Sequence, residues 1–222
     1  MANEYLKRTP TSTGNRKVFT WSGWVKRNTI TGSYILFSAG IQGDFVPGGN
    51  GFQITFDYDE IQLKGGNTGT DRVNTASLYR DTGSWFHLLF HIDTTKLVET
   101  DRYKLYINGV EYTGPYDYAT PNWPSLNFEY STNFQVKPHT ISASSGNPAA
   151  YLNCQLTDVF FVDGQALTPE VFGYHKANTG YMSVGSTQAT KFKKGAWTPK
   201  DPKIIKSIIN ARGGFGVNGF YL

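Results

Sequence analysis

Apolar and polar residues alternate along much of this chain with the two-residue period of β-strands. In residues 102–112, Tyr103, Leu105 and Ile107 share one face, and Lys104 and Tyr106 share the other. The alternation breaks at Asn108-Gly109, a pair that readily supplies the positive φ angles of a type I′ turn. The segment therefore predicts a β-hairpin, and with it antiparallel β structure.

Similar patterns recur from the N-terminal region to residue 162. Within residues 16–26, Phe19, Trp21, Gly23 and Val25 share one face. Other strands are expected at residues 34–38, 52–58, 61–64, 76–79, 85–92 and 151–162. Short strands separated by turn residues are typical of a β-sandwich. We therefore predict an all-β fold, an antiparallel β-sandwich of the jelly-roll kind.

The sequence predicts one short helix, near residues 168–175. Thr168 is a good N-cap, Pro169 suits the first helical position, and Glu170 favours the positive end of a helix. From Thr187 onward the pattern loosens, and an extended C-terminal arm is expected. The predicted division is a jelly-roll domain at 1–186 and a basic arm at 187–222.

Composition excludes several classes of protein. Only 17% of residues are charged, low for a helical or disordered protein, whereas 39% are hydrophobic and 15% aromatic. No apolar run approaches the roughly 20 residues that span a membrane, so membrane insertion is not expected. Residues 1–8 lack the apolar centre of a signal peptide, and Cys154 is the only cysteine. We therefore expect synthesis in the cytoplasm without oxidative folding.

Positive charge is concentrated at the C-terminal end. Residues 191–222 contain seven basic residues and one acid, whereas the other 190 residues contain 14 basic and 16 acidic ones. Such a tail suits a solvated arm or an acidic partner surface. Nucleic acid is not the expected partner, because the lysines do not follow the spacing of a helix face. The residues predicted to dock a partner are Lys193, Lys194, Lys200, Lys203 and Lys206.

Acidic residues cluster at one predicted turn, in the sequence Asp57-Tyr58-Asp59-Glu60. Asp57 and Asp59 are candidate calcium ligands, because Ca²⁺ takes oxygen ligands from loops. The alternative is a solvated turn without a ligand, and no other cofactor is expected. His87 and His91 lie about 13 Å apart on a strand, too far to share one zinc ion.

Aromatic residues are dense in the irregular stretch that follows the hairpin. Tyr112, Tyr116, Tyr118 and Trp123 could present flat rings to a sugar, because each ring combines an apolar face with a polar tip. Alternatively, these rings cap the open end of the sandwich or pack on a neighbouring subunit.

Four segments in order resemble the laminin-G-like, concanavalin-A-like lectin/glucanase jelly roll. They are residues 19–26, 85–88, 104–110 and 155–169. A narrower resemblance, carried by residues 5–10, 22–27, 163–169 and 216–222, is to lectin-like modules in structural proteins of marine bacteriophages. The resemblance implies two stacked antiparallel sheets and binding rather than catalysis. The glucanase signature of two Glu around an Asp on one strand is missing from residues 54–60.

These observations favour a non-enzymatic virion structural protein, as a head decoration, fibre or tail component. It would be made in the host cytoplasm and act outside the cell, with other virion proteins, copies of itself and a host-surface glycan as partners. The alternatives are a free carbohydrate-binding module and a glycan hydrolase.

Overall fold

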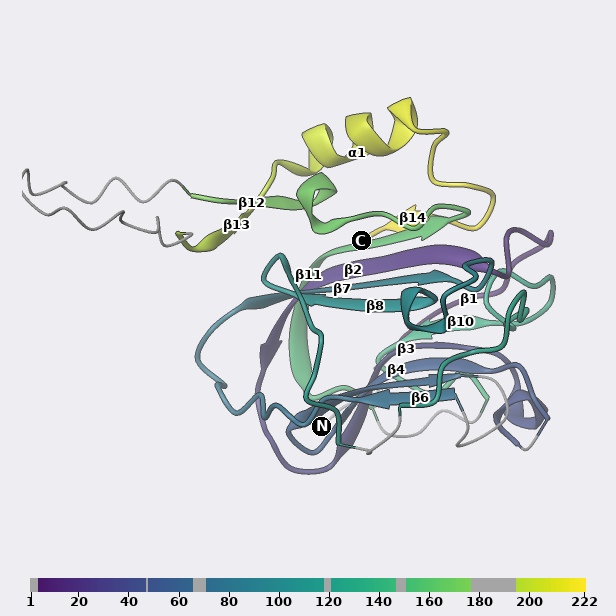
Figure 1. Ribbon diagram of the computed structural model, residues 1–222, viewed down its shortest axis with the longest axis horizontal. Coiled ribbons are helices and arrows are strands. Elements are labelled where there is room, and N and C mark those ends of the chain that lie inside the picture. Colours follow the sequence, from purple (N-terminus) through teal and green to yellow (C-terminus); the bar gives the residue numbers. More distant parts are fainter. Residues whose placement is uncertain (1–3, 47, 66–70, 118–120, 147–150, 177–194) are drawn as a thin grey trace, which may run out of the picture.

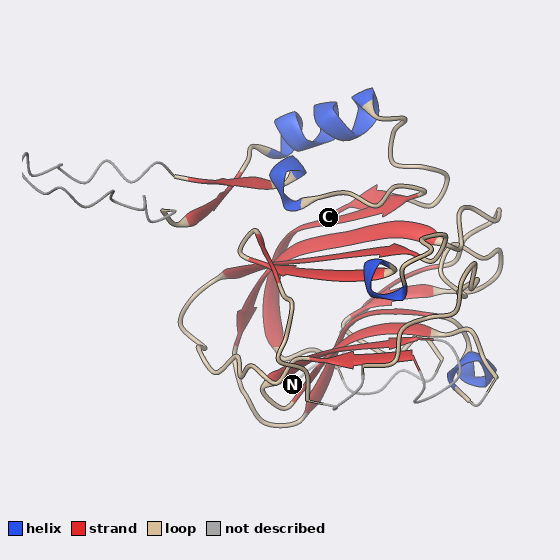
Figure 2. Cartoon of the chain, viewed as in Figure 1, coloured by secondary structure: helices blue, strands red, loops and turns tan. Residues whose placement is uncertain are grey.

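Two antiparallel sheets of six strands each stack face to face (Figures 1 and 2). The computed structural model describes residues 4–46, 48–65, 71–117, 121–146, 151–176 and 195–222. The first sheet has the order β1 (Leu6–Arg8), β10 (His139–Ile141), β3 (Ser33–Ala39), β4 (Phe52–Asp57), β5 (Glu60–Gly65) and β6 (Asp71–Asn74). The second has the order β14 (Phe220–Tyr221), β11 (Cys154–Asp163), β2 (Val18–Arg27), β7 (Phe86–Asp93), β8 (Tyr103–Ile107) and β9 (Val110–Glu111). The predicted β-sandwich is confirmed.

The hairpin at Asn108-Gly109 is also confirmed. It joins β8 to β9, and its two turn residues have φ angles of 49° and 77°. Both angles are positive, as a type I′ turn requires.

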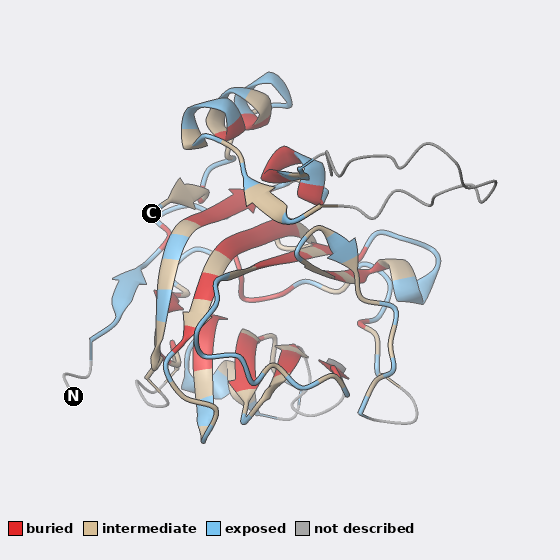
Figure 3. Cartoon of the chain, turned by 90° about the vertical axis from the view of Figure 1, so that its left-hand side faces the viewer, coloured by how far each residue is buried: buried red, intermediate tan, exposed pale blue. Residues whose placement is uncertain are grey.

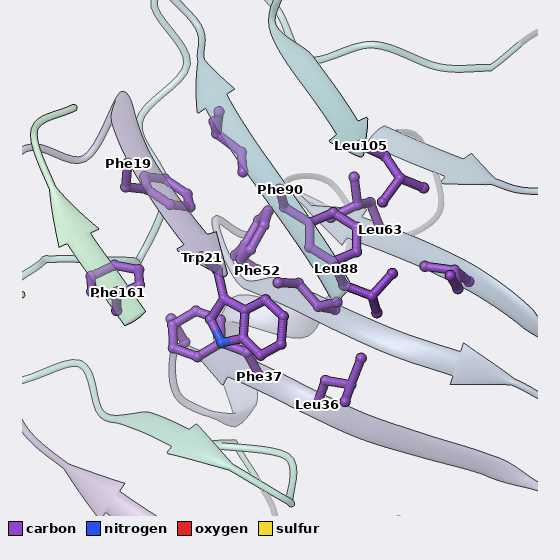
Figure 4. Close-up of a cluster of buried hydrophobic side chains, with 14 of the residues drawn as sticks. Phe19, Trp21, Leu36, Phe37, Phe52, Leu63, Leu88, Phe90, Leu105 and Phe161 are labelled. Atoms are coloured by element: carbon purple, nitrogen blue, oxygen red, sulfur yellow. The ribbon is translucent and has the colours of Figure 1, made fainter. Parts of the chain in front are cut away.

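The main core lies between the two sheets and is rich in aromatic residues (Figure 4). Phe19, Trp21 and Val25 of β2 point into it, as their shared strand face requires. The indole of Trp21 extends over Gly23, where an added Cβ would lie 2.9 Å from its Cη2 atom. The glycine therefore makes room for the largest side chain of the core.

A second hydrophobic cluster covers the outer face of the second sheet. Leu89, Phe160 and Val162 project from that face. They meet Leu167, Val171 and Phe172 around the 3₁₀ helix η3 (Pro169–Val171), and Ile205 and Ile209 of the helix α1 (Pro202–Ala211). Figure 1 shows α1 lying outside β14 and β11 as a third layer. The strands of both sheets are largely buried, whereas β1 is exposed (Figure 3).

One prediction about the C-terminal part is confirmed only for its first turn, and another is wrong. The helix expected near 168–175 is a single 3₁₀ turn, η3, after which the chain enters β12 (Gly173–His175). The arm expected to be extended contains β13 (Trp197–Pro199), α1 and β14, and β14 pairs with β11. The physical reason is the burial of apolar side chains: Ile205 and Ile209 are four residues apart and bury one face of α1 on the sandwich.

The strand expected at residues 76–79 is wrong as well, because the strand forms at Asp71–Asn74 and pairs with β5. Ala76 N instead donates to Pro115 O at 3.1 Å, and Tyr79 N donates to Asp59 O at 2.7 Å. Loop contacts therefore take the backbone donors that a sheet would have used. In the described part of the chain, 3₁₀ turns also form at η1 (Gln42–Phe45) and η2 (Glu99–Asp101).

A buried carboxylate joins the two ends of the chain. Asp163 accepts hydrogen bonds from Asn15 N at 2.7 Å and Asn218 N at 3.1 Å, and the Asn218 amide donates to Ser12 O at 3.1 Å. Burial raises the pKa of Asp163, and these hydrogen bonds oppose that rise. The residues after α1 thus serve as a structural cap of the sandwich.

Candidate functional site

The sandwich is open along the edge where its two outermost strands, β6 and β9, end the two sheets. The segment after β9 bridges this opening. Thr75 and Tyr116 form an isolated antiparallel bridge, and Asp117 N donates to Asn74 O at 3.2 Å. The predicted aromatic stretch therefore starts as a strap across the edge.

A pocket of about 240 Å³ lies beside this strap. We call it the edge pocket. It is lined by Leu63, Val73, Thr100, Tyr103, Lys104, Leu105, Glu111, Tyr112, Thr113, Tyr116 and Trp123. Three of the four predicted sugar-binding residues, Tyr112, Tyr116 and Trp123, thus meet at one place. The fourth, Tyr118, lies outside the described residues.

The three rings are held edge to face. The centroids of Tyr112 and Tyr116 are 5.5 Å apart, and those of Tyr116 and Trp123 are 5.9 Å apart, with interplanar angles of 80° and 89°. Ala76 N donates to the Tyr112 hydroxyl at 3.1 Å, and the Tyr116 hydroxyl donates to Tyr112 O at 3.3 Å. All three side chains are half-buried and pack on the core, so they close the edge as well as line the pocket.

The positive charge of Lys104 in the edge pocket is neutralised by two nearby carboxylates. Lys104 Nζ lies 2.8 Å from Glu111 Oε1 and 2.9 Å from Asp101 Oδ1. The hydrogen bond to Glu111 raises the pKa of Lys104, and Asp101 adds to the rise. Burial, together with Tyr112 and Glu111, raises the pKa of Tyr116, so its phenol stays neutral. The pocket therefore offers aromatic surface beside groups that can donate and accept hydrogen bonds.

The predicted calcium residues, Asp57 and Asp59, lie at the β4–β5 turn and have protein partners. The Ser33 hydroxyl donates to Asp57 Oδ1 at 2.5 Å, and Arg80 Nε donates to Asp59 Oδ2 at 2.5 Å. The hydrogen bond from Arg80 lowers the pKa of Asp59. Among the described residues, no group of three or more His, Cys, Asp or Glu side chains could hold a metal ion.

The predicted docking lysines differ in their surroundings. Lys200 Nζ donates to Glu170 O, and Lys206 Nζ lies 4.0 Å from the centre of the Tyr221 ring. Lys203 is exposed on α1, so part of the basic charge does follow a helix, contrary to the sequence-based expectation. Lys193 and Lys194 lie outside the described residues.

A pair that resembles a nucleophile and its base is unsuited to catalysis. Ser22 Oγ and His87 Nε2 are 2.8 Å apart, but both residues are 1% exposed. Burial lowers the pKa of His87 to about 3. No substrate reaches this hydroxyl in the folded protein, so the pair is part of the packing of the second sheet.

Sequence reasoning missed a second hollow, of about 300 Å³, at the end of the hairpin. We call it the Trp85 pocket. It is lined by Leu78, Tyr79, Arg80, Asp81, Ser84, Trp85, Phe86, Ile107 and Asn108. The available signal was the position of Trp85 at the first residue of the strand expected at 85–92, and the structure places it just before β7. In the described part of the chain, no helix is long and apolar enough to cross a membrane.

Comparisons with known proteins agree with this architecture. The family model described as the concanavalin A-like lectin/glucanases superfamily matches residues 2–171. Curated protein sequences give no match. The native heptameric SAP-like pentraxin from Limulus polyphemus is 12% identical, with a TM-score of 0.50, and the alignment covers 89% of this chain and 85% of that chain.

Two further structures are more distant. Domains LG4-5 of the mouse laminin α1 chain are 10% identical, with a TM-score of 0.48, and the alignment covers 73% of this chain and 40% of that chain. The Ruminococcus gnavus IT-sialidase CBM40, bound to α2,3-sialyllactose, is 13% identical, with a TM-score of 0.44 and coverages of 68% and 90%. At such identities the pentraxin likeness shows a shared fold alone.

Proposed function

This chain belongs to the concanavalin A-like lectin/glucanase superfamily, and from that premise we propose that it is a non-enzymatic module that binds a glycan in the edge pocket. The observation that carries the proposal is the convergence of Tyr112, Tyr116 and Trp123 on one hollow beside the Lys104–Glu111 pair. Aromatic faces accept the apolar CH surface of a sugar, and the charged pair can bond its hydroxyl groups.

Trp123 is the residue best suited to contact a ligand. Tyr112 and Tyr116 use their hydroxyls in hydrogen bonds within the strap. Among the described residues, the indole N–H of Trp123 has no hydrogen-bond acceptor, and it does not belong to the buried unpartnered atoms. It is therefore open to a partner from solution.

Replacing Trp123 with alanine should weaken glycan binding about 3- to 10-fold, the equivalent of roughly 0.5–1.5 kcal/mol for one aromatic contact. Binding can be screened on a glycan array and quantified by isothermal titration calorimetry. Tyr174→Ala is the matched control, because Tyr174 is 46% exposed and lies on β12, outside the edge pocket. An affinity for glycan that is unchanged by Trp123→Ala would remove the edge pocket from consideration.

The non-enzymatic part of the proposal is supported by the surroundings of the candidate catalytic groups. Asp59 is bound to Arg80, and the Ser22–His87 pair is inaccessible. Measured glycan hydrolysis that is lost on Asp59→Asn or Glu60→Gln substitution would contradict it.

We also propose that the module is displayed on a virion, where it attaches to a host-surface glycan. The support is the resemblance of both chain ends to bacteriophage structural modules. These ends lie side by side here: Arg8 Nη1 donates to Asn218 O at 3.1 Å. Copies of the chain would associate symmetrically, and the exposed basic face around Lys203 would contact other virion proteins. Mass spectrometry of purified particles should detect the chain, and its absence would exclude this role.

A further inference from the structure

Four of the five tryptophans have an evident structural role. Trp21 is fully buried in the core, and Trp24 packs on His87 with centroids 5.4 Å apart. Trp123 contacts Tyr116 in the edge pocket. Trp197 docks the β12–β13 ribbon on the hairpin turn, since a Cβ added at Gly109 would lie 2.3 Å from its Cε3 atom.

Trp85 is different. Its side chain is 40% exposed, and among the described residues its indole makes no ring contact and no hydrogen bond. Leu78, which is 47% exposed, lines the same pocket, so two large apolar side chains face solvent together. Single exposed apolar residues are ordinary, but an exposed apolar pair in a hollow indicates a binding surface.

Polar groups with spare bonding capacity surround this apolar floor. Arg80 donates to Asp59 through Nε, and its terminal nitrogens have no partner in the described part of the chain. Asp81 Oδ1 accepts from Gly83 N at 2.7 Å and Ser84 N at 3.1 Å. Asn108 Oδ1 accepts from His87 N at 2.9 Å, which fixes the side chain and leaves its NH₂ group to donate.

The side chains that line the Trp85 pocket indicate which kind of ligand it can bind. The positive side chain, Arg80, is paired with Asp59, and the negative one, Asp81, accepts two backbone hydrogen bonds. Neither charge requires an oppositely charged ligand, so an uncharged ligand fits best. An indole face with a fixed amide, a guanidinium and a carboxylate at its rim suits a neutral sugar ring, which is apolar on its faces and hydroxylated around its edge.

The Trp85 pocket and the edge pocket are neighbours. The Ser77 hydroxyl lies 3.4 Å from the hydroxyl of Tyr112 in the edge pocket, and the next residue, Leu78, lines the Trp85 pocket. Asn108 and Tyr112 lie at the two ends of β9, at most about 13 Å apart at 3.3 Å per residue. In addition, β9 is the last strand of its sheet, so no strand among the described residues pairs with its outer side.

We propose that the Trp85 pocket is a second sugar subsite, and that the ligand is a neutral oligosaccharide which runs along β9 from the edge pocket to Trp85. This inference rests on the proposed glycan-binding function and extends it to the length and charge of the ligand. It makes Trp85 a residue that selects longer glycans.

The test compares ligand length in wild-type protein and two variants. The probes are neutral oligosaccharides of one to six units from the glucose, galactose and N-acetylglucosamine series, and affinity is measured by calorimetry. Wild-type affinity should rise with length. Trp85→Ala should weaken binding of the longer members about 3- to 10-fold and leave single sugars unchanged, whereas Trp123→Ala should weaken binding at every length.

Control variants distinguish the second sugar subsite from the proposed glycan-binding function. Trp85→Phe keeps an apolar face and should restore part of the affinity, and Tyr174→Ala should bind like wild type. Circular dichroism should show unchanged folding for Trp85→Ala, because the residue is exposed and precedes β7. If Trp85→Ala binds every length like wild type while Trp123→Ala does not, the second subsite is wrong and the proposed function stands. Wild-type protein that binds only charged glycans would also overturn the subsite, and a protein that binds none would contradict both.

Discussion

Acidification below pH 6 should destabilise this protein steeply, because two buried histidines are neutral in the folded state. Burial lowers the pKa of His87 and of His139 to about 3, whereas an unfolded histidine has a pKa of roughly 6.5. His139 Nε2 also accepts a hydrogen bond from Asn133 N at 2.9 Å, which a protonated ring could not do. The structure and the direction of both pKa shifts therefore agree.

The sign follows from proton uptake on unfolding. Above about pH 6.5 the folded and unfolded states both bind few protons at these two histidines, so the histidines take nothing from the free energy of unfolding. As the pH falls toward 3 the unfolded state takes up protons that the folded state excludes, at about 1.4 kcal/mol per pH unit for each histidine. The pair should therefore remove roughly 5 kcal/mol between pH 6 and pH 4, comparable to the stability of a whole domain.

Urea unfolding followed by tryptophan fluorescence from pH 4 to pH 8 measures this dependence. His87→Gln should reduce the slope below pH 6, and the His87→Gln/His139→Gln double variant should reduce it further. The part that remains includes His91, whose pKa is also lowered by burial. A slope that is unchanged in the double variant would show that carboxylates, not these histidines, cause the acid sensitivity.

Replacing Arg27 with leucine should cost about 3–4 kcal/mol of stability. Arg27 is fully buried; Nη1 donates to Tyr79 O at 2.8 Å, and Nη2 donates to Tyr58 O. Its guanidinium lies 4.3 Å from the centre of the Phe56 ring. Burial lowers the pKa of Arg27, opposed by nearby Cys154 and Asp59. Leucine would fill part of the space but leave two backbone carbonyls without donors, at about 1–3 kcal/mol each.

Chemical denaturation of the wild-type protein and of the Arg27→Leu variant measures this difference in the free energy of unfolding. Arg80→Ala is the matched control, since the Arg80 side chain is 63% exposed and its ion pair with Asp59 should contribute at most about 1 kcal/mol. An Arg27→Leu variant that loses less than Arg80→Ala would show that the loops around Tyr58 and Tyr79 find other donors.

The sandwich was predictable because its signals are local. Alternation placed Phe19, Trp21 and Val25 on one face, and the Asn108-Gly109 turn fixed a hairpin. Neither inference needs a distant contact, because the two-residue period and the positive φ angles belong to the segments themselves.

The longer helix, α1, was not predicted, although two segments carry the same helix-start signal. Thr168-Pro169 and Asp201-Pro202 both offer a cap followed by proline, and in the structure Asp201 Oδ1 accepts from Lys203 N at 2.7 Å. What distinguishes them is the apolar spacing of Ile205 and Ile209, which an interpretation of the tail by its charge alone overlooked.

The candidate site was predictable in part. Aromatic density indicated Tyr112, Tyr116 and Trp123, and the structure brings these three together. The lining from Thr100, Lys104 and Glu111 was not foreseeable, because it depends on how β8 and η2 meet the strap. The Trp85 pocket joins the segment 78–86 to the hairpin turn, a contact that no local pattern encodes.

The sequence by itself determined the longer strands, the faces they bury, the main hairpin and the superfamily, since these depend on period, turn chemistry and the order of short segments. Tertiary structure alone decided that the basic tail folds onto the second sheet, that Asp163 is capped by Asn218, and that one tryptophan of five faces solvent over a pocket. The physical reason is that burial and hydrogen-bond satisfaction depend on which distant segments come into contact. Those contacts are determined only by the packing of all apolar faces of the chain together.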